Sequence, residues 1–88
     1  MKVKEGYMLR NVADNYIVVA VGENALDFNG LITTNETGAF LWELLEDNKS
    51  FDDLLSSVLN EYEIDEATAK ADIDGFIKKL KDADLLEL

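Results

Sequence analysis

The sequence predicts an α+β fold, winged-helix-like, in which a three-stranded antiparallel sheet is followed by three helices. Runs of β-branched and aromatic residues with short polar breaks fill the first 34 residues. After Asn35 the apolar spacing changes from two to three or four residues, which is the spacing of helices. The chain has 88 residues and a hydrophobic content of 48%, which is enough for one core, so we expect a single domain over residues 1–88.

Three strands are expected before Asn35. Tyr7–Val12 and Tyr16–Val21 predict a hairpin, because both runs favour strands and they flank the short polar turn Ala13–Asn15. Leu26–Thr33 predicts the third strand, in which Gly30 indicates a bulge or a close backbone approach.

Each expected helix begins at a residue that can cap it. Asn35, Ser50 and Asp65 are suitable N-caps, and Ser50 forms a capping box with a carboxylate three residues later. Trp42 lies beside the first apolar stripe and is expected to widen the core. The chain then finishes with the short apolar tail Leu85–Leu88. The three stripes are Phe40, Leu41, Leu44 and Leu45; Phe51, Leu54, Leu55, Val58, Leu59 and Tyr62; and Ala69, Ile73, Phe76, Ile77 and Leu80.

The composition excludes much catalytic chemistry. Without cysteine the chain has no thiolate nucleophile, and without histidine it has no imidazole base or ligand. We therefore expect no metal, no cofactor and no enzyme activity. No apolar run is long enough for a membrane span or a signal peptide, which predicts a cytoplasmic protein without membrane contact.

The charge is negative and unevenly distributed. Residues 1–34 hold three basic and four acidic residues, whereas residues 35–88 hold five basic and fifteen acidic ones, and the net charge is −11. Nucleic acids and anionic membranes are bound largely by basic residues that neutralise phosphates, so neither is an expected partner. A peptide with basic or apolar side chains suits this charge better.

Two local motifs lack residues that the chemistry they suggest would need. Lys70–Ile77 resembles part of a calcium loop, but Lys70 and Lys81 stand where carboxylates would have to coordinate the ion, so a solvated helix face is the better interpretation. An acyl carrier would need a serine after an aspartate at a helix start. Ser56 and Ser57 lie mid-helix without a preceding aspartate.

The alternative function is a winged-helix regulator or a protein-interaction domain. Its recognition helix would be residues 66–82, which mixes four acidic with four basic residues and has no arginine to recognise guanine. The cluster Lys78, Lys79 and Lys81 is typical of a helix C-terminus, although it could also hold an acidic residue of a peptide.

The chain resembles the PqqD-like proteins, which are peptide chaperones built on the recognition element of ribosomally made, post-translationally modified peptides. The most specific part is Leu31–Leu45, where Asn35-Glu36-Thr37-Gly38 is similar to the family's asparagine-x-threonine-small segment before an aromatic and leucine helix. Phe51–Leu54, Tyr62 and Phe76–Leu80 match the family's spacing of apolar positions.

The resemblance implies that a precursor's leader peptide is added as a strand in a groove between the third strand and the third helix. The joint at residues 35–38 would then keep this groove open. Ile73 and Phe76 could equally belong to the core, because one apolar stripe serves both. The implied peptide-binding residues are Phe28, Asn29, Gly30, Leu31, Ile32 and Thr33 on the strand, mostly through backbone, and Asp72, Ile73, Phe76 and Lys79 on the helix.

The resemblance also implies the partners. The proteins of pyrroloquinoline quinone synthesis resemble one another around a proline-containing strand segment and a cysteine, and this chain has neither proline nor cysteine. We therefore expect the domain to deliver a precursor peptide to a radical S-adenosylmethionine (radical SAM) enzyme of another peptide-modifying pathway, and to act as a monomer or weak dimer.

Overall fold

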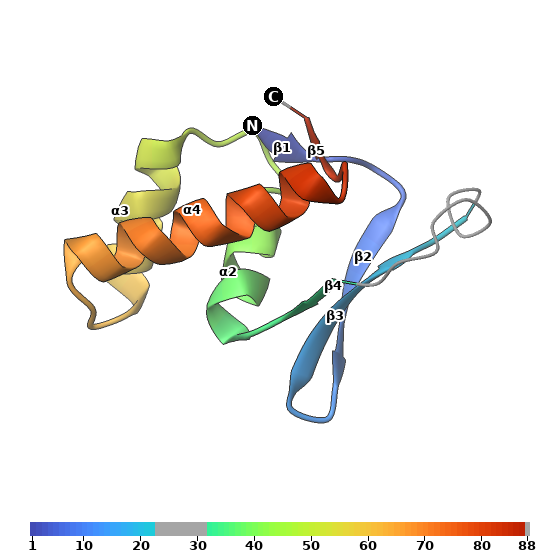
Figure 1. The fold of residues 1–88 in the computed structure, drawn as a ribbon, viewed down its shortest axis with the longest axis horizontal. Helices are drawn as coiled ribbons and strands as arrows, with labels where there is room; N and C mark the ends of the chain where they lie inside the picture. Colours follow the sequence, from blue (N-terminus) through green and yellow to red (C-terminus); the bar gives the residue numbers. More distant parts are fainter. Residues whose placement is uncertain (23–31, 88) are drawn as a thin grey trace.

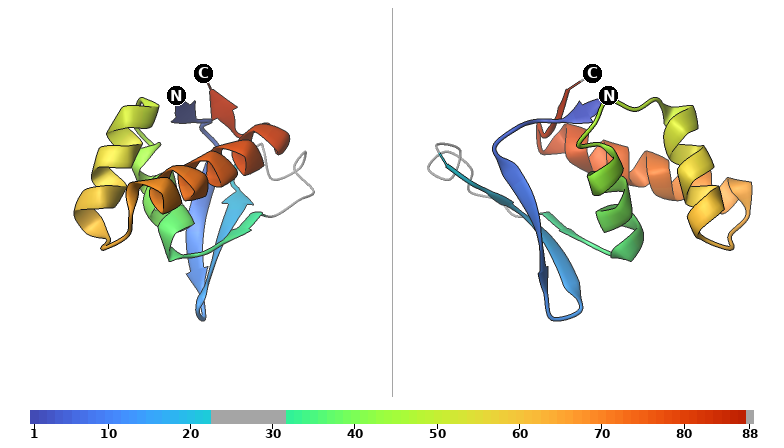
Figure 2. Two further views of the ribbon diagram at one scale, coloured as in Figure 1. Left: turned by 60° about the vertical axis from the view of Figure 1, so that its left-hand side comes forward. Right: turned by 180° about the vertical axis from the view of Figure 1, so that it is seen from behind.

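The computed structural model describes residues 1–22 and 32–87 of the chain. These residues form a three-stranded antiparallel sheet, three helices and a separate pair of short strands (Figure 1). The α+β class, with a three-stranded sheet and three helices, is therefore confirmed. The hairpin of the sheet extends beyond the helices, and residues 2–3 lie beside residues 86–87 (Figure 2).

The sheet has the order β2-β3-β4, formed by Tyr7–Val12, Asn15–Ala20 and Ile32–Thr34. Its hairpin turn is shorter than the sequence suggested. Asn15, which we had placed in the turn, pairs with Val12 and belongs to β3, so the turn contains Ala13 and Asp14 alone. Ala13 has a φ of 56°, in the left-handed region that two-residue hairpin turns require.

The short turn sets which backbone groups face which neighbour. In a two-residue hairpin the closing residues, here Val12 and Asn15, exchange hydrogen bonds, and the pattern alternates along the strand. Further along the chain, the N–H of Val21 donates to the carbonyl of Gly6 at 2.8 Å, which fits the same alternation. The odd-numbered residues of β3 therefore direct their backbone groups towards β2, and the even-numbered ones direct theirs towards β4.

The alternation continues into β4. Ile32 is paired with Val18 and Thr34 with Tyr16, so their backbone groups bond to β3. Thr33, opposite Ile17, directs its N–H and C=O away from β3. Among the described residues β4 is an edge strand, and Thr33 is the residue whose backbone faces outwards from it.

The helices begin where the sequence predicted. They are α2 (Glu36–Leu44), α3 (Phe51–Glu61) and α4 (Glu66–Asp82). The side chain of Asn35 accepts a hydrogen bond from the Gly38 N–H at 2.8 Å, and the capping box at Ser50 is formed. None of the helices in residues 1–22 and 32–87 combines the length and the apolar character needed to cross a bilayer.

The core lies where the helices meet the inner face of the sheet. Trp42 is only 1% exposed, which confirms its expected place in the core. The ring of Phe40 meets that of Tyr62 edge to face, with centroids 5.6 Å apart, and joins α2 to the end of α3. The buried cluster contains Val3, Val18, Ile32, Leu41, Trp42, Leu45, Leu54, Val58, Ala69, Ile73, Phe76, Ile77, Leu80, Leu85 and Leu86.

The sequence did not predict the pair of strands at the chain ends. β1 (Lys2–Val3) pairs with β5 (Leu86–Glu87), so part of the expected apolar tail is a strand. The N–H of Val3 donates to the carbonyl of Leu45 at 2.8 Å, which ties this pair to the end of α2. Strands of two residues are too short to show a periodicity, and they form here where Val3, Leu85 and Leu86 are buried.

The cap of α4 gives a prediction about acid stability. Thr68 donates hydrogen bonds to the Asp65 carboxylate from its side chain and its backbone N–H, which holds the pKa of Asp65 below its usual 3.8. This contribution to stability is present above pH 3.8 and is lost as the pH falls through the lower folded-state pKa. We expect Asp65→Asn, which keeps the cap but cannot titrate, to lose less stability than wild type on acidification from pH 7.

Urea unfolding at a series of pH values measures this difference. Asp53, whose pKa is lowered by hydrogen bonds from Ser50, offers the matched variant Asp53→Asn, and the double variant should show a still flatter pH dependence. Identical acid dependence in wild type and Asp65→Asn would contradict the assignment.

Candidate functional site

A groove runs between the outward edge of β4 and the long helix α4. Among residues 1–22 and 32–87, the side chain of Lys79 crosses it. The ammonium of Lys79 donates to the Thr33 carbonyl at 3.1 Å, which agrees with the outward direction of that carbonyl. The backbone group that an added strand would use is therefore occupied by a lysine of the chain itself.

Lys79 separates two neighbouring hollows, which we call the Thr34 hollow and the Ile32 hollow. Both hollows are bordered by Gly75 and Lys79. The Thr34 hollow has a volume of about 190 Å³ and is lined by both polar and apolar residues. The Ile32 hollow is mainly apolar. The further lining residues are Thr34, Asn35, Thr37, Gly38, Leu41, Ala71, Asp72 and Phe76 for the first hollow, and Ile32, Lys78, Asp82 and Ala83 for the second.

The structure brings most of the predicted site residues that it describes to this groove. The helix residues Asp72, Phe76 and Lys79 line the Thr34 hollow, and Ile32 lines the other. Thr33 is exposed on the edge strand between them.

Ile73 and the start of the predicted strand are not part of the groove as the structure describes it. Ile73 is completely buried and lines neither hollow, so the structure places its side chain in the core behind the groove. Phe76 is 6% exposed and belongs to the core as well as to the groove wall. The remaining strand candidates, Phe28–Leu31, lie outside the described residues and stay a prediction.

Several groove residues were missed from the sequence, above all Gly75 and Ala83. Gly75 had been considered only as part of a calcium loop. The signal that could have found it is its spacing, since Asp72, Gly75, Phe76 and Lys79 are three or four residues apart and must share a face of a helix. Ala83, the C-cap of α4, carries no comparable signal.

The joint between β4 and α2 is tightly packed. A Cβ added at Gly38 would overlap the Thr34 hydroxyl and lie 2.9 Å from the Thr34 Cβ. Glycine at this position therefore lets the end of β4 lie directly against the first turn of α2, while Asn35 caps that turn. Thr34 and Gly38 both border the Thr34 hollow, so this contact helps to shape the groove.

The charges around the groove are unevenly distributed. Lys78 pairs with Asp82 at 3.2 Å, whereas the Lys79 ammonium is directed into the groove. Asp72 contributes a carboxylate to the Thr34 hollow. No group of three or more acidic, histidine or cysteine residues in the described part of the chain could hold a metal ion. The groove offers backbone hydrogen bonds, apolar surface and single charges, a combination that suits an extended chain.

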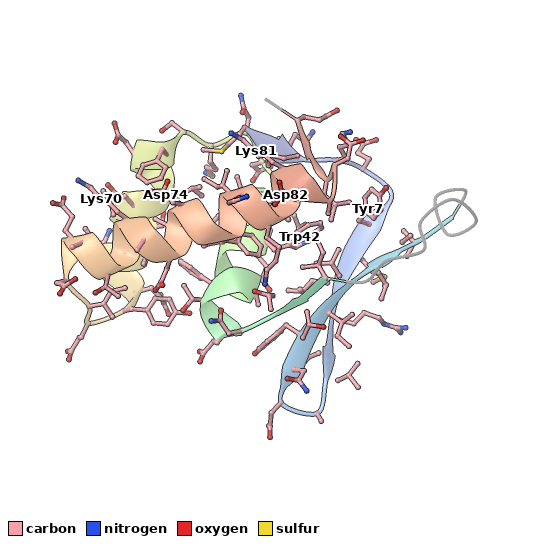
Figure 3. The ribbon with its side chains drawn as sticks, in the orientation of Figure 1. Tyr7, Trp42, Lys70, Asp74, Lys81 and Asp82 are labelled. Carbon is pink, nitrogen blue, oxygen red and sulfur yellow. The ribbon has the colours of Figure 1, made fainter. Side chains whose placement is uncertain are left out.

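Charged residues that do not line the groove are spread along α4. Lys70, Asp74 and Lys81 are exposed along the helix (Figure 3). Lys70 approaches Glu66 at 3.8 Å, one turn earlier. Exposed pairs of this kind contribute little to stability, so we assign these residues to solvation.

Comparisons with known proteins fit this geometry. The sequence model of the family described as "Coenzyme PQQ synthesis protein D (PqqD)" matches residues 16–86. A comparison with curated proteins gave no significant match. The fold is similar to a solved structure, TbiB1 in complex with the TbiA(beta) leader peptide, with a TM-score of 0.74 and 22% sequence identity. The likeness covers 99% of this chain and 95% of that one.

The joint gives a prediction about stability. Gly38→Ala should destabilise the fold by about 1–3 kcal/mol, although alanine favours helices, because the new methyl group would collide with Thr34. The same substitution in a Thr34→Ala background should cost less, since the collision is removed. Chemical denaturation of the four proteins of this cycle measures the coupling between the two residues. A purely additive cycle would show that the two side chains do not compete for space.

Proposed function

The chain belongs to the PqqD family, and on that premise we propose that it is a non-catalytic peptide chaperone. In this proposal the leader segment of a ribosomally made precursor peptide binds in the groove between β4 and α4. The domain then presents the precursor to a radical SAM enzyme that modifies it.

The observation that carries the proposal is the backbone direction of Thr33. Its N–H and C=O face outwards from an edge strand, and a peptide in the groove can pair with both, extending the sheet by one strand. Such binding uses the peptide backbone, so it tolerates different sequences, while contacts in the hollows supply selectivity.

Hydrogen-bond energies indicate that backbone pairing alone is not sufficient for micromolar binding of a peptide. Two hydrogen bonds at Thr33 contribute about 1–3 kcal/mol in total. A micromolar complex needs about 8 kcal/mol, after the cost of ordering the peptide. Each apolar side chain buried in the groove adds about 1.5–3 kcal/mol. The hollows must therefore provide much of the affinity, together with the predicted contributions of Phe28–Leu31.

Two further observations support a leader peptide as the ligand. TbiB1, whose fold this chain shares, was solved with a leader peptide, and we extend that kind of ligand to the groove described above. The net charge of −11 disfavours nucleic acid, the ligand of the alternative regulator. It favours a leader whose binding segment is apolar or basic.

A selected peptide provides the first test. Peptides of about ten residues, the length of a long strand, are randomised, displayed on phage and selected against the wild-type domain. The strongest is synthesised and titrated while the backbone amide signals are followed by NMR. We expect the largest shifts at residues 32–34 and on the groove face of α4. Selection of no binder, or shifts confined to the β2 edge, would overturn the proposal.

Two proline variants locate the pairing edge. Thr33→Pro removes an outward N–H, so the fold should persist while affinity for the selected peptide falls at least tenfold. Ile32→Pro removes an N–H that bonds to β3 and should instead destabilise the sheet, as urea unfolding measures. A folded Thr33→Pro variant with wild-type affinity would show that peptides bind elsewhere.

The lysine that crosses the groove gives a second test. A peptide that pairs with the Thr33 carbonyl must displace the Lys79 ammonium. Lys79→Met keeps most of the side-chain length but removes this competitor, so affinity for the selected peptide should rise about two- to tenfold. Lys70→Met is the control, because it removes the same charge away from the groove and should leave affinity unchanged. Weaker binding in Lys79→Met alone would show that the ammonium contacts the peptide directly.

The enzyme partner is tested separately. The proposal expects a radical SAM enzyme and a short precursor to be encoded beside this chain. With purified components, modification of that precursor should slow when Thr33→Pro replaces the wild-type domain. Equal rates with both domains would remove the presentation step from the proposal.

A further inference from the structure

No contact among the described residues explains a glycine in the middle of α4. Glycine is the weakest helix former apart from proline, and Gly75 stands inside a helix of 17 residues. Apart from the backbone of its own helix, a Cβ added there would meet no atom of residues 1–22 and 32–87 within 4 Å, so no close contact in this part of the chain requires its absence. Gly38 is different, because an added Cβ would collide with Thr34.

Gly75 lies at the centre of the groove. It borders both the Thr34 hollow and the Ile32 hollow, on the face of α4 that is directed towards β4. The missing side chain therefore leaves open space where the two hollows meet.

The alternation of an added strand matches this layout. Side chains at paired positions of neighbouring strands point to the same face of a sheet, and Ile32 and Thr34 are the β4 residues on the inner face. A peptide paired at Thr33 would direct two side chains towards α4, one beside Ile32 and one beside Thr34. These side chains are two residues apart in the peptide, and each meets one hollow.

We propose that Gly75 is the specificity-determining residue of the groove, and that it admits a peptide with a large apolar residue and a polar residue separated by one position. This inference rests on the proposed function. The apolar residue occupies the Ile32 hollow against Ile32 and Ala83, beside Lys79 and the Lys78–Asp82 ion pair. The polar residue occupies the hollow beside Thr34, where Asn35 and Asp72 offer hydrogen-bonding groups.

Substitutions at Gly75 test the proposal with the selected peptide as probe. Gly75→Ala and Gly75→Leu extend a side chain into open space, so both variants should fold and unfold at higher urea concentration than wild type. We expect the dissociation constant to rise about fivefold for Gly75→Ala and more than fiftyfold for Gly75→Leu. Asp74→Ala is the control, because it also favours the helix but lies outside both hollows, and its affinity should match that of wild type.

The peptide side of the contact completes the test. In the wild-type complex, replacing the large apolar residue of the selected peptide with alanine should weaken binding at least tenfold. In Gly75→Leu, where the added side chain fills the space, the same replacement should weaken binding by a smaller factor.

The outcomes separate this inference from the function on which it rests. If wild type binds the selected peptide with amide shifts at residues 32–34 but Gly75→Leu binds equally well, the role of Gly75 is refuted and the chaperone proposal stands. Selected peptides that lack an apolar and a polar residue two positions apart would also refute it. If wild type binds no peptide, the proposed function itself fails.

Discussion

The direction of hydrogen bonding across the sheet is the constraint on which the groove depends, and it is set far from the groove. Because the turn at Ala13 and Asp14 has two residues, Asn15 pairs with Val12 and every later pairing follows in strict alternation. A one-residue slip between β3 and β4 would exchange the roles of Ile32 and Thr33 and turn Ile32 out of the core. The carbonyl of Thr33 would then bond to β3. The backbone N–H and C=O of Ile32, instead of those of Thr33, would be directed towards the groove.

α4 has two functions along one helix. Ile73, Ile77 and Leu80 are buried in the core, so this face fixes the helix against the rest of the fold. The adjoining face, with Gly75 and Lys79, borders the groove. Phe76 takes part in both, since it is nearly buried and still lines the Thr34 hollow. Packing of the core therefore also sets the distance between the helix and β4.

The sequence predicted the elements well where the local signal was strong. The caps at Asn35, Ser50 and Asp65 formed as expected, because a side-chain acceptor at a helix start acts within a few residues. The pairing of β1 with β5 was missed, since it joins the two ends of the chain and depends on tertiary burial. For the site, the structure places the predicted residues Asp72, Phe76 and Lys79 along the groove, and their contact with a peptide stays a prediction. Periodicity alone could not separate groove from core at Ile73 or find the opening at Gly75.

An exposed strand edge is also a surface on which identical chains can polymerise. Two copies of this chain that met edge to edge would each bring a charge of −11 into close proximity. At physiological ionic strength such charges still repel over a distance of about 8 Å, which is comparable to the spacing of adjacent strands and their side chains. A neutral or cationic segment meets no such barrier. The negative charge of the helical half thus opposes the association of two copies at the β4 edge, and it does so without covering the edge itself.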